Sequence, residues 1–266
     1  MNSYTNKKLS VIITAYSEHE ITVVHIREAM NANHTPDEII VVNDGGDPRL
    51  FRMIEDELPK KKRKCKIIYA RINEDILWNY PGAVNLGAWL STGEYLAFED
   101  NDNIPSRTFY DQAIEKFEEF PEVGRIQANK RQRMTKWAFL TKPFEEWKPM
   151  KPGIGPNMGT AMIRRDVVLM LKGQDERLSG SYGWMYIDWR WKMIAQAKIK
   201  FGSVGFYWYV LNAQSNLSRR RTSHNLKIRR ENCRAAKPHN KHPMLNFTYT
   251  MKILDKYERR LPKIKK

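Results

Sequence analysis

The run Leu96-Ala97-Phe98-Glu99-Asp100-Asn101-Asp102-Asn103 decides how the fold of this chain is interpreted. Residues typical of a buried strand lead directly into two aspartates separated by one residue. Because open α/β sheets bind ligands at the carboxyl ends of their strands, this run would present both carboxylates at a binding edge. Such oxygen donors suit Mg²⁺ or Mn²⁺, and a metal held there can bind a diphosphate. Alone, the pattern is also compatible with a solvated turn or a helix cap.

Strands alternate with helices on the N-terminal side of this run. The expected strands cover residues 9–16, 38–42, 67–70 and 94–98, and the expected helices cover 18–31, 49–58 and 82–91. This alternation predicts an α/β fold with a mostly parallel, doubly wound sheet. Thr14, Asp44 and Asp100 would then lie side by side along one edge of the sheet. The chain has no G-x-G-x-x-G fingerprint after its first strand and no P-loop, which argues against those two classes of nucleotide-binding protein.

The second half of the chain has a less regular pattern. The sequence predicts a helix at 109–120, a strand or two with a polar loop within 125–140, a loop at 147–157, a strand at 158–163, a short helix at 166–171, a helix at 186–195 and a strand at 204–211. Glycine and aromatic residues fill the loop 180–184, which opens the helix at 186–195 and is suited to closing over a substrate.

Positive charge is concentrated at the C-terminal end of the chain. The net charge is +16, and residues 213–266 hold 16 basic and 3 acidic side chains, which gives this fifth of the sequence +13. A block of this kind typically contacts a polyanion such as nucleic acid, an anionic lipid surface or an acidic glycan. The alternative is a solubilising helix and tail with no specific partner.

Composition indicates an intracellular protein with a sizeable core. The hydrophobic content is 41%, and no apolar run approaches the roughly 18 residues of a membrane span. The first eight residues lack the apolar segment of a signal peptide. Cys65 and Cys233 are the two cysteines, so a disulfide scaffold or a zinc site is not expected. We therefore predict a cytoplasmic location without a transmembrane segment.

Five ordered motifs resemble those of the family 2 glycosyltransferases, which have the GT-A fold. The motifs are residues 10–16 (SVIITAY), 41–46 (VVNDGG), 82–87 (GAVNLG), 93–102 (GEYLAFEDND) and Ile187-Asp188 followed by Arg190. The resemblance covers roughly residues 9–218. It implies a Rossmann-like, mostly parallel sheet flanked by helices, here with a basic helical C-terminal extension. It also implies a nucleotide-sugar-binding half at 1–105, an acceptor-binding and catalytic half at 106–212, and the extension at 213–266.

The resemblance also implies roles for individual residues. The residues that bind the donor would be Thr14, Tyr16, Asp44, Asn85 and Asp100. The metal ligands would be Asp100 and Asp102, and the catalytic base would be Asp188. The chemistry is consistent with these roles. A divalent cation stabilises the charge that develops on a departing diphosphate. A carboxylate within about 3 Å of the acceptor hydroxyl can take its proton. Single displacement with one base inverts the anomeric centre.

Three positions depart from the family pattern. Asn43 stands where the family has the first aspartate of a pair, so base recognition would fall to Asp44. Val84 replaces the usual Arg or Lys before Asn85, which removes one expected cation near the phosphates. Asn103 replaces a common final aspartate, which is a milder change.

Further residues are weaker candidates. His224 could be a late metal ligand, although a histidine among arginines is more often solvated. Trp184 could stack on a sugar or a base, although such aromatic residues are as often part of the core. Arg219, Arg220 and Arg221 could recruit an acceptor through its phosphates, which would make binding fall steeply with salt.

These observations favour a metal-dependent, inverting glycosyltransferase that uses a nucleotide-diphosphate sugar, with a UDP-sugar as the main expectation. The basic extension favours a polyanionic acceptor, for example DNA with a hydroxylated base, which would have to be flipped out of the helix. One alternative is assembly of cell-surface polysaccharide or lipopolysaccharide, with the extension on anionic lipid headgroups. A second is a non-catalytic nucleic-acid-binding module on a GT-A scaffold.

Overall fold

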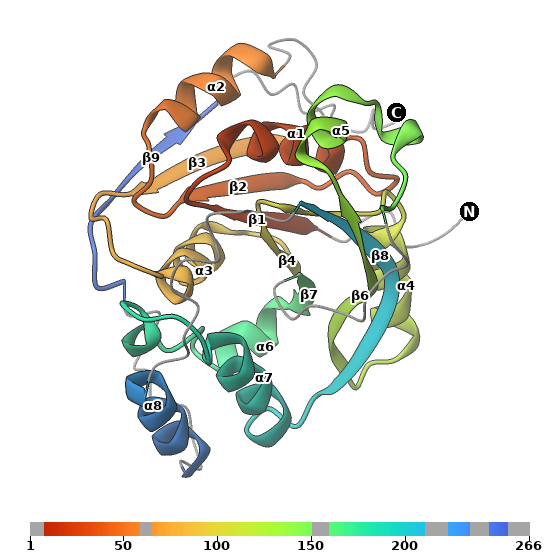
Figure 1. Cartoon of the computed structure of the whole chain (residues 1–266). Helices are drawn as coiled ribbons and strands as arrows, with labels where there is room; N and C mark the ends of the chain where they lie inside the picture. Colours follow the sequence, from red (N-terminus) through yellow and green to blue (C-terminus); the bar gives the residue numbers. More distant parts are fainter. Residues whose placement is uncertain (1–7, 59–64, 151–159, 211–222, 235–244, 255–266) are drawn as a thin grey trace, which may run out of the picture.

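A single nine-stranded sheet organises the described part of the chain, with the strand order β5-β8-β6-β7-β4-β1-β2-β3-β9 (Figure 1). The computed structural model describes residues 8–58, 65–150, 160–210, 223–234 and 245–254. Its strands are β1 (Leu9–Ala15), β2 (Glu38–Asn43), β3 (Lys66–Ile72), β4 (Tyr95–Asp100), β5 (Asn103–Pro105), β6 (Val123–Met134), β7 (Ala161–Arg164), β8 (Lys200–Val210) and β9 (Tyr249–Ile253).

Eight α-helices accompany the sheet in the described part of the chain. They are α1 (His19–Met30), α2 (Arg49–Glu57), α3 (Tyr80–Leu90), α4 (Phe109–Glu119), α5 (Lys136–Thr141), α6 (Arg165–Met170), α7 (Met185–Ala195) and α8 (Ser223–Arg234). Two short 3₁₀ turns, η2 (Phe144–Glu146) and η3 (Glu176–Leu178), lie in the second half. The helices and strands expected before residue 105 are all present, with ends shifted by a few residues.

The direction of the strands changes across the sheet. β4, β1, β2 and β3 are parallel neighbours, which is the part of the sheet that the alternation of strands and helices predicts. β7 is antiparallel to both β4 and β6, whereas β6 and β8 run parallel to each other. The whole sheet is therefore mixed. Every residue of β1 and β2 is buried, as expected for central strands covered on both faces.

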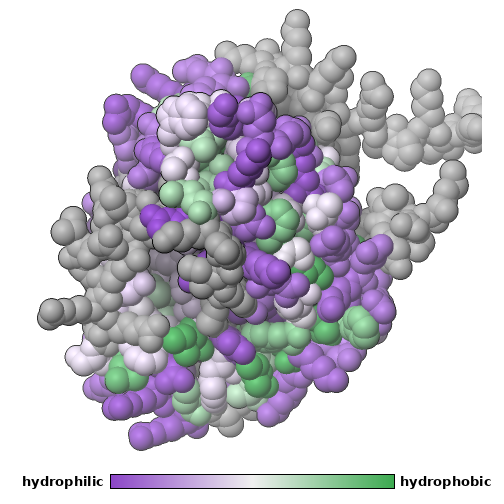
Figure 2. Space-filling view, turned by 45° about the vertical axis from the view of Figure 1, so that its right-hand side comes forward, coloured by the Kyte–Doolittle hydropathy of each residue, from purple (hydrophilic) through white to green (hydrophobic). Residues whose placement is uncertain are grey.

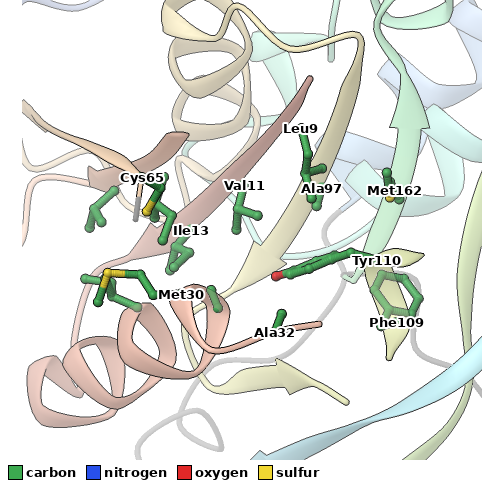
Figure 3. Close-up of a cluster of buried hydrophobic side chains, with 14 of the residues drawn as sticks. Leu9, Val11, Ile13, Met30, Ala32, Cys65, Ala97, Phe109, Tyr110 and Met162 are labelled. Carbon is green, nitrogen blue, oxygen red and sulfur yellow. The ribbon is translucent and has the colours of Figure 1, made fainter. Parts of the chain in front are cut away.

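Two hydrophobic cores lie on opposite faces of the sheet because successive strand side chains alternate in direction. Val11 and Ile13 of β1 belong to the core formed with α1, α2 and α4, part of which is drawn in Figure 3. Ile12 belongs to the core formed with α3, α6 and α7. Figure 1 shows the two sets of helices on the two sides of the sheet. A smaller cluster beneath α5 contains Phe139 and Trp208.

The segment 125–140 differs from its prediction. One 12-residue strand, β6, is followed by helix α5, where one or two shorter strands with a polar loop were expected. Polar residues are tolerated in the second half of β6 because Lys130 to Arg133 pair with β8 while their side chains are exposed or half-buried. Most of the loop expected at 147–157 lies outside the described residues.

The described parts of the C-terminal extension pack against the rest of the fold. α8 contacts α7, and β9 pairs antiparallel with β3 at the edge of the sheet. Arg219, Arg220 and Arg221 lie outside the described residues. Hydrophilic residues dominate the face shown in Figure 2, and hydrophobic residues lie in small groups among them. Within the described ranges, no helix has the length and apolar composition of a membrane span.

Candidate active site

The carboxyl ends of three parallel strands meet at one edge of the sheet. Thr14 of β1 is in register with Val42 of β2 on one side and with Asp100 of β4 on the other. Asp44 follows β2 directly, and its backbone N–H donates to the carbonyl of Ala15 at 2.8 Å. The structure thus brings Thr14, Asp44 and Asp100 together at the edge where α/β sheets bind ligands.

A tight turn fixes the position of Asp44. Gly45 has a φ of +77°, a conformation that glycine adopts without strain. At Gly46 a Cβ atom would lie 2.2 Å from the carbonyl oxygen of Tyr16, so the loops after β1 and β2 approach each other too closely for any side chain there. Tyr16 itself is 52% exposed beside this turn, and its hydroxyl is 3.5 Å from the carboxylate of Asp75.

Asp44 is buried and held by a chain of two hydrogen bonds. The Asn79 side chain donates to its Oδ1 at 3.0 Å, and the Ser179 hydroxyl donates to Asn79 at 2.7 Å. Burial raises the pKa of Asp44 to about 7, with the hydrogen bond from Asn79 opposing the shift and the charge of Asp75 adding to it. Ser179, from the second half of the chain, is therefore linked to this carboxyl through Asn79, a connection that only the structure reveals.

Replacing Asp44 by Asn is expected to change how stability depends on pH. The folded protein holds the Asp44 proton up to about pH 7, whereas the unfolded chain releases it near pH 4. Wild-type stability therefore falls as pH rises between these values, and D44N lacks this loss. Since the buried amide carries its own desolvation cost, we expect D44N to be more stable by about 2 kcal/mol at pH 8. Urea unfolding at pH 5 and pH 8 measures the free energy of unfolding of both proteins. An equal difference between D44N and the wild type at the two pH values would contradict the raised pKa of Asp44.

The residue between the two aspartates anchors the turn that carries them. Asn101 donates from its backbone N–H to the carbonyl of Thr14 at 3.1 Å and from its side chain to the carbonyl of Ser17 at 2.6 Å. The ring of His25 lies 3.1 Å from the carbonyl of Asn101 and 2.6 Å from the carboxylate of Glu99. Because Asn101 is bound from the protein side, the turn is fixed independently of any ligand.

The carboxyl group of Asp100 is buried near the charge of Asp102. Burial raises the pKa of Asp100 to about 8, the charge of Asp102 adds to the shift, and a hydrogen bond from Tyr186 opposes it. The Tyr186 hydroxyl lies 3.0 and 3.1 Å from the two Asp100 oxygens, and the Asn103 side chain donates to Oδ2 at 3.2 Å. A cation held by both side chains would favour the ionised form of Asp100.

The two aspartates fit a divalent cation that is shared with a substrate. Among the described residues, no group of three or more His, Cys, Asp or Glu side chains could hold a metal ion by itself. Mg²⁺ and Mn²⁺ sites in phosphate-handling enzymes commonly use one or two carboxylates, with phosphate and water oxygens as the other ligands. Asp100 and Asp102 match that donor set. His224, which is exposed at the start of α8, belongs to no group of three or more possible metal ligands in the described ranges.

Asn85 is bound by protein groups of the second half of the chain. It is fully buried in α3, its side-chain N–H groups donate to the Gln174 carbonyl and to Glu176, and its Oδ1 accepts from the Gln174 N–H. Glu176 in turn accepts hydrogen bonds from the backbone N–H groups of Leu245 and Asn246. The amide of Asn85 thus joins distant segments of the chain, and its contact with the donor stays a prediction.

Asp188 is also removed from solvent. Its carboxylate pairs with the ammonium of Lys192 at 3.4 Å and accepts from the Asn232 side chain of α8 at 3.0 Å. Its exposure is 1%, and burial raises its pKa, with Lys192 and Asn232 opposing the shift. The structure gives Asp188 a structural pairing between α7 and α8 in place of an open position beside an acceptor. Its role as catalytic base stays a prediction.

Trp184 contacts α8 at the entrance of α7. It has a φ of +71°, and the guanidinium of Arg229 lies 5.3 Å from its ring centroid. The Asn225 side chain of α8 donates to the carbonyls of Leu178, Ser181 and Gly183, which fixes the preceding loop. The cation that stacks on Trp184 is therefore part of the protein, and a sugar or base would have to share or replace it.

Three important residues escaped the sequence analysis, namely Asn79, Tyr186 and Asn232. Asn79 and Asn232 are joined to their partners across 35 and 44 positions, and no local pattern signals such contacts. Helical spacing gives a signal for Tyr186 only once the direction of Asp188 is known, because these two residues, two positions apart on a helix, do not face the same side. If Asp188 faces α8, then Tyr186 must face elsewhere.

The fold is of the GT-A type, as its similarity to solved glycosyltransferases shows. The mannosyltransferase PcManGT from Pyrobaculum calidifontis, solved with GDP-Man and Mn²⁺, has a TM-score of 0.55 and 17% identity, over 84% of this chain and 61% of that one. S. aureus TarS (residues 1–349), solved with UDP-GlcNAc, has a TM-score of 0.58 and 13% identity, over 82% and 60%.

Sequence comparisons identify the family. The model of glycosyl transferase family 2 matches residues 10–169, more than half of the chain, and the chain belongs to this family. An uncharacterized glycosyltransferase of Rickettsia bellii is 33% identical over 97 residues, which are 36% of this chain and 13% of that protein. One from Haemophilus influenzae is 27% identical over 106 residues, or 40% and 31%. The matches thus span less than a third of these curated relatives.

Proposed function

We propose that this chain transfers a sugar from a nucleotide-diphosphate donor to a hydroxyl acceptor with the help of Mn²⁺ or Mg²⁺. The observation that carries the proposal is the meeting of Asp44, Asp100 and Asp102 at one edge of a family 2 fold. The solved relatives, bound to GDP-Man with Mn²⁺ and to UDP-GlcNAc, support a nucleotide-sugar as the donor class. A UDP-sugar remains our first expectation.

The proposed roles follow from the positions of the side chains. Asp44, with Thr14 and Tyr16 beside it, would bind the nucleoside end of the donor, while Asp100 and Asp102 would hold the metal–diphosphate end. The bound cation supplies Lewis-acid stabilisation of the departing diphosphate. Single displacement, and therefore inversion, is the stereochemistry we propose. Asp188 is the candidate base, and it can act on an acceptor only if its contact with Asn232 opens.

A donor screen tests this proposal most directly. Melting temperatures are measured with Mn²⁺ and a panel of UDP-, GDP- and other nucleotide-sugars, because a ligand that binds the folded state stabilises it by mass action. A shift of several degrees with one donor, lost when Mn²⁺ is omitted, is the expected result. No shift with any donor, together with no donor hydrolysis, would favour the non-catalytic module.

The basic C-terminal region supports a polyanionic acceptor, and DNA with a hydroxylated base is our favoured example. In the described part of this region, α8 exposes Lys227, Arg230 and Arg234 at spacings that place them on one helix face. The opposite side of α8 is anchored to α7 and its loop, so this basic face has a fixed position relative to the site. Assembly of cell-surface glycans, with anionic lipid beneath the basic region, is the second candidate because the same charges suit either surface.

Salt dependence distinguishes these acceptors from neutral ones. With hydroxymethylated DNA as acceptor, we expect affinity to fall by about 100-fold between 50 and 200 mM salt if about four phosphates are contacted. The variant K227E/R230E should weaken binding at low salt and flatten this dependence. R52E, on exposed α2, is the matched control and should change neither. Salt-insensitive transfer to a neutral glycan would contradict the polyanion proposal, and transfer to lipid-linked glycan alone would favour the second candidate.

A further inference from the structure

We infer that Tyr186 is a positioning residue whose hydroxyl fixes the carboxylate of Asp100 within the metal-binding motif. The inference rests on the proposed function, because it concerns how the carboxylates are presented to the cation. It assigns a role to a side chain of α7 that the motif resemblance passes over. The Tyr186 hydroxyl lies 3.0 Å from one Asp100 oxygen and 3.1 Å from the other, so a single phenol engages both.

Helix α7 presents different residues on its two sides. Tyr186 reaches the end of β4, whereas Asp188, two positions later, pairs with Lys192 and with Asn232 of α8. Residues two apart on a helix point about 200° away from each other, so both cannot face the same site. The group of α7 that reaches the aspartate motif in this structure is therefore a phenol, whereas the carboxylate of Asp188 is bonded to Lys192 and to Asn232 of α8.

The ring of Tyr186 is held by a neighbouring ring, and the turn before it is fixed. It packs against the ring of Tyr80 from α3, with centroids 4.6 Å apart. The turn before it contains Gly183 and Trp184 with φ values of +96° and +71°, and Asn225 of α8 donates to the Gly183 carbonyl at 3.0 Å. A hydroxyl on a ring held in this way can define the orientation of the carboxylate it binds.

The arrangement has a consequence for the neighbouring carboxylates. The phenol of Tyr186 and the Asn103 amide, which donates at 3.2 Å, hold the carboxyl group of Asp100 in one orientation. Both aspartates are then presented together before a cation arrives, which lowers the cost of ordering them on binding.

The test compares Y186F with Y95F. Y186F removes only the hydroxyl. Y95F is the matched control, because the Tyr95 hydroxyl also binds a carboxylate, that of Glu118, but at the opposite end of β4. Mn²⁺ binding in the presence of UDP is titrated by electron paramagnetic resonance, and kcat, KM and melting temperature are measured alongside. We expect Y186F to bind Mn²⁺ about tenfold more weakly and to lose kcat, and Y95F to bind Mn²⁺ as the wild type does.

The outcomes separate this inference from the proposed function. If wild-type protein binds Mn²⁺ and transfers sugar while Y186F binds Mn²⁺ equally tightly, the positioning role is overturned and the proposed function stands. If Y95F weakens Mn²⁺ binding as much as Y186F, the effect is a general loss of stability, which also overturns the inference. If the wild type binds neither Mn²⁺ nor any donor, both fail. Weak Mn²⁺ binding by Y186F alone, with a melting temperature near that of Y95F, supports it.

Discussion

Replacing Asp188 by Asn is expected to lower the free energy of unfolding by about 3–5 kcal/mol, because it removes the carboxylate that pairs with the buried ammonium of Lys192. The two side chains are each about 1% exposed, and their charged atoms lie 3.4 Å apart. For a chain of this size, such a loss lowers the melting temperature by roughly 10 °C. Calorimetry or urea unfolding measures the effect directly.

The loss of stability in D188N should come from the buried charge of Lys192 that is left without its carboxylate, and not from the loss of a stabilising ion pair. Replacing buried ion pairs by apolar groups of similar size is often neutral, whereas removing one partner is strongly destabilising. We therefore expect the double variant D188N/K192M to regain most of the stability lost in D188N. E231Q is a suitable control: Glu231 pairs with Arg177 at 3.3 Å, but both are more than 40% exposed, so its loss should change stability by less than about 0.5 kcal/mol.

The same variant decides between two roles for Asp188. A structural pair predicts that D188N loses stability, while the fraction that stays folded at low temperature still transfers sugar. A catalytic base predicts the reverse, namely a melting temperature near that of the wild type and transfer reduced by at least about 100-fold. The second result would contradict the structural role and would imply that α8 moves away from α7 during catalysis.

The parallel half of the fold could be predicted because its signals are local. β1 and β2 are continuous runs of β-branched residues, and each is followed by a turn and an amphipathic helix, so period and length are enough to identify them. The carboxyl ends of such strands lie at one edge by topology alone. The sequence alone therefore groups Thr14, Asp44 and Asp100 at this edge.

The remaining features depend on contacts between distant residues. β9 is exposed along its whole length and becomes a strand because β3 offers an unpaired edge, from about 180 positions earlier in the chain. Asn85 matches a donor-binding motif, yet Gln174 and Glu176 occupy its amide. Asp188 matches a catalytic motif, yet its direction depends on Asn232. Motif matching identifies a residue type and position, but the partners decide whether that residue faces the site.

Replacing Asp102 by Asn is expected to reduce sugar transfer by about 10³-fold without lowering stability. A bound cation stabilises the departing diphosphate by several kcal/mol, and about 4 kcal/mol corresponds to this factor. Stability should be unchanged or slightly higher, because the charge of Asp102 disfavours ionisation of the buried Asp100 in the folded protein. Transfer assays and melting temperatures measured on the same preparation separate the two effects. D166N, at an exposed position of α6, is the control and should leave both unchanged.

Removing the metal should reproduce the effect of D102N and should not add to it. If Asp102 acts by holding the cation, EDTA lowers wild-type transfer to about the level of the variant, and excess Mn²⁺ restores the wild type alone. EDTA should have little further effect on D102N, because effects that remove the same interaction are not additive. Full transfer by the wild type in EDTA would refute a metal-dependent reaction. A further large loss when EDTA is added to D102N would show that the cation is held mainly by other groups, with Asp102 acting apart from it.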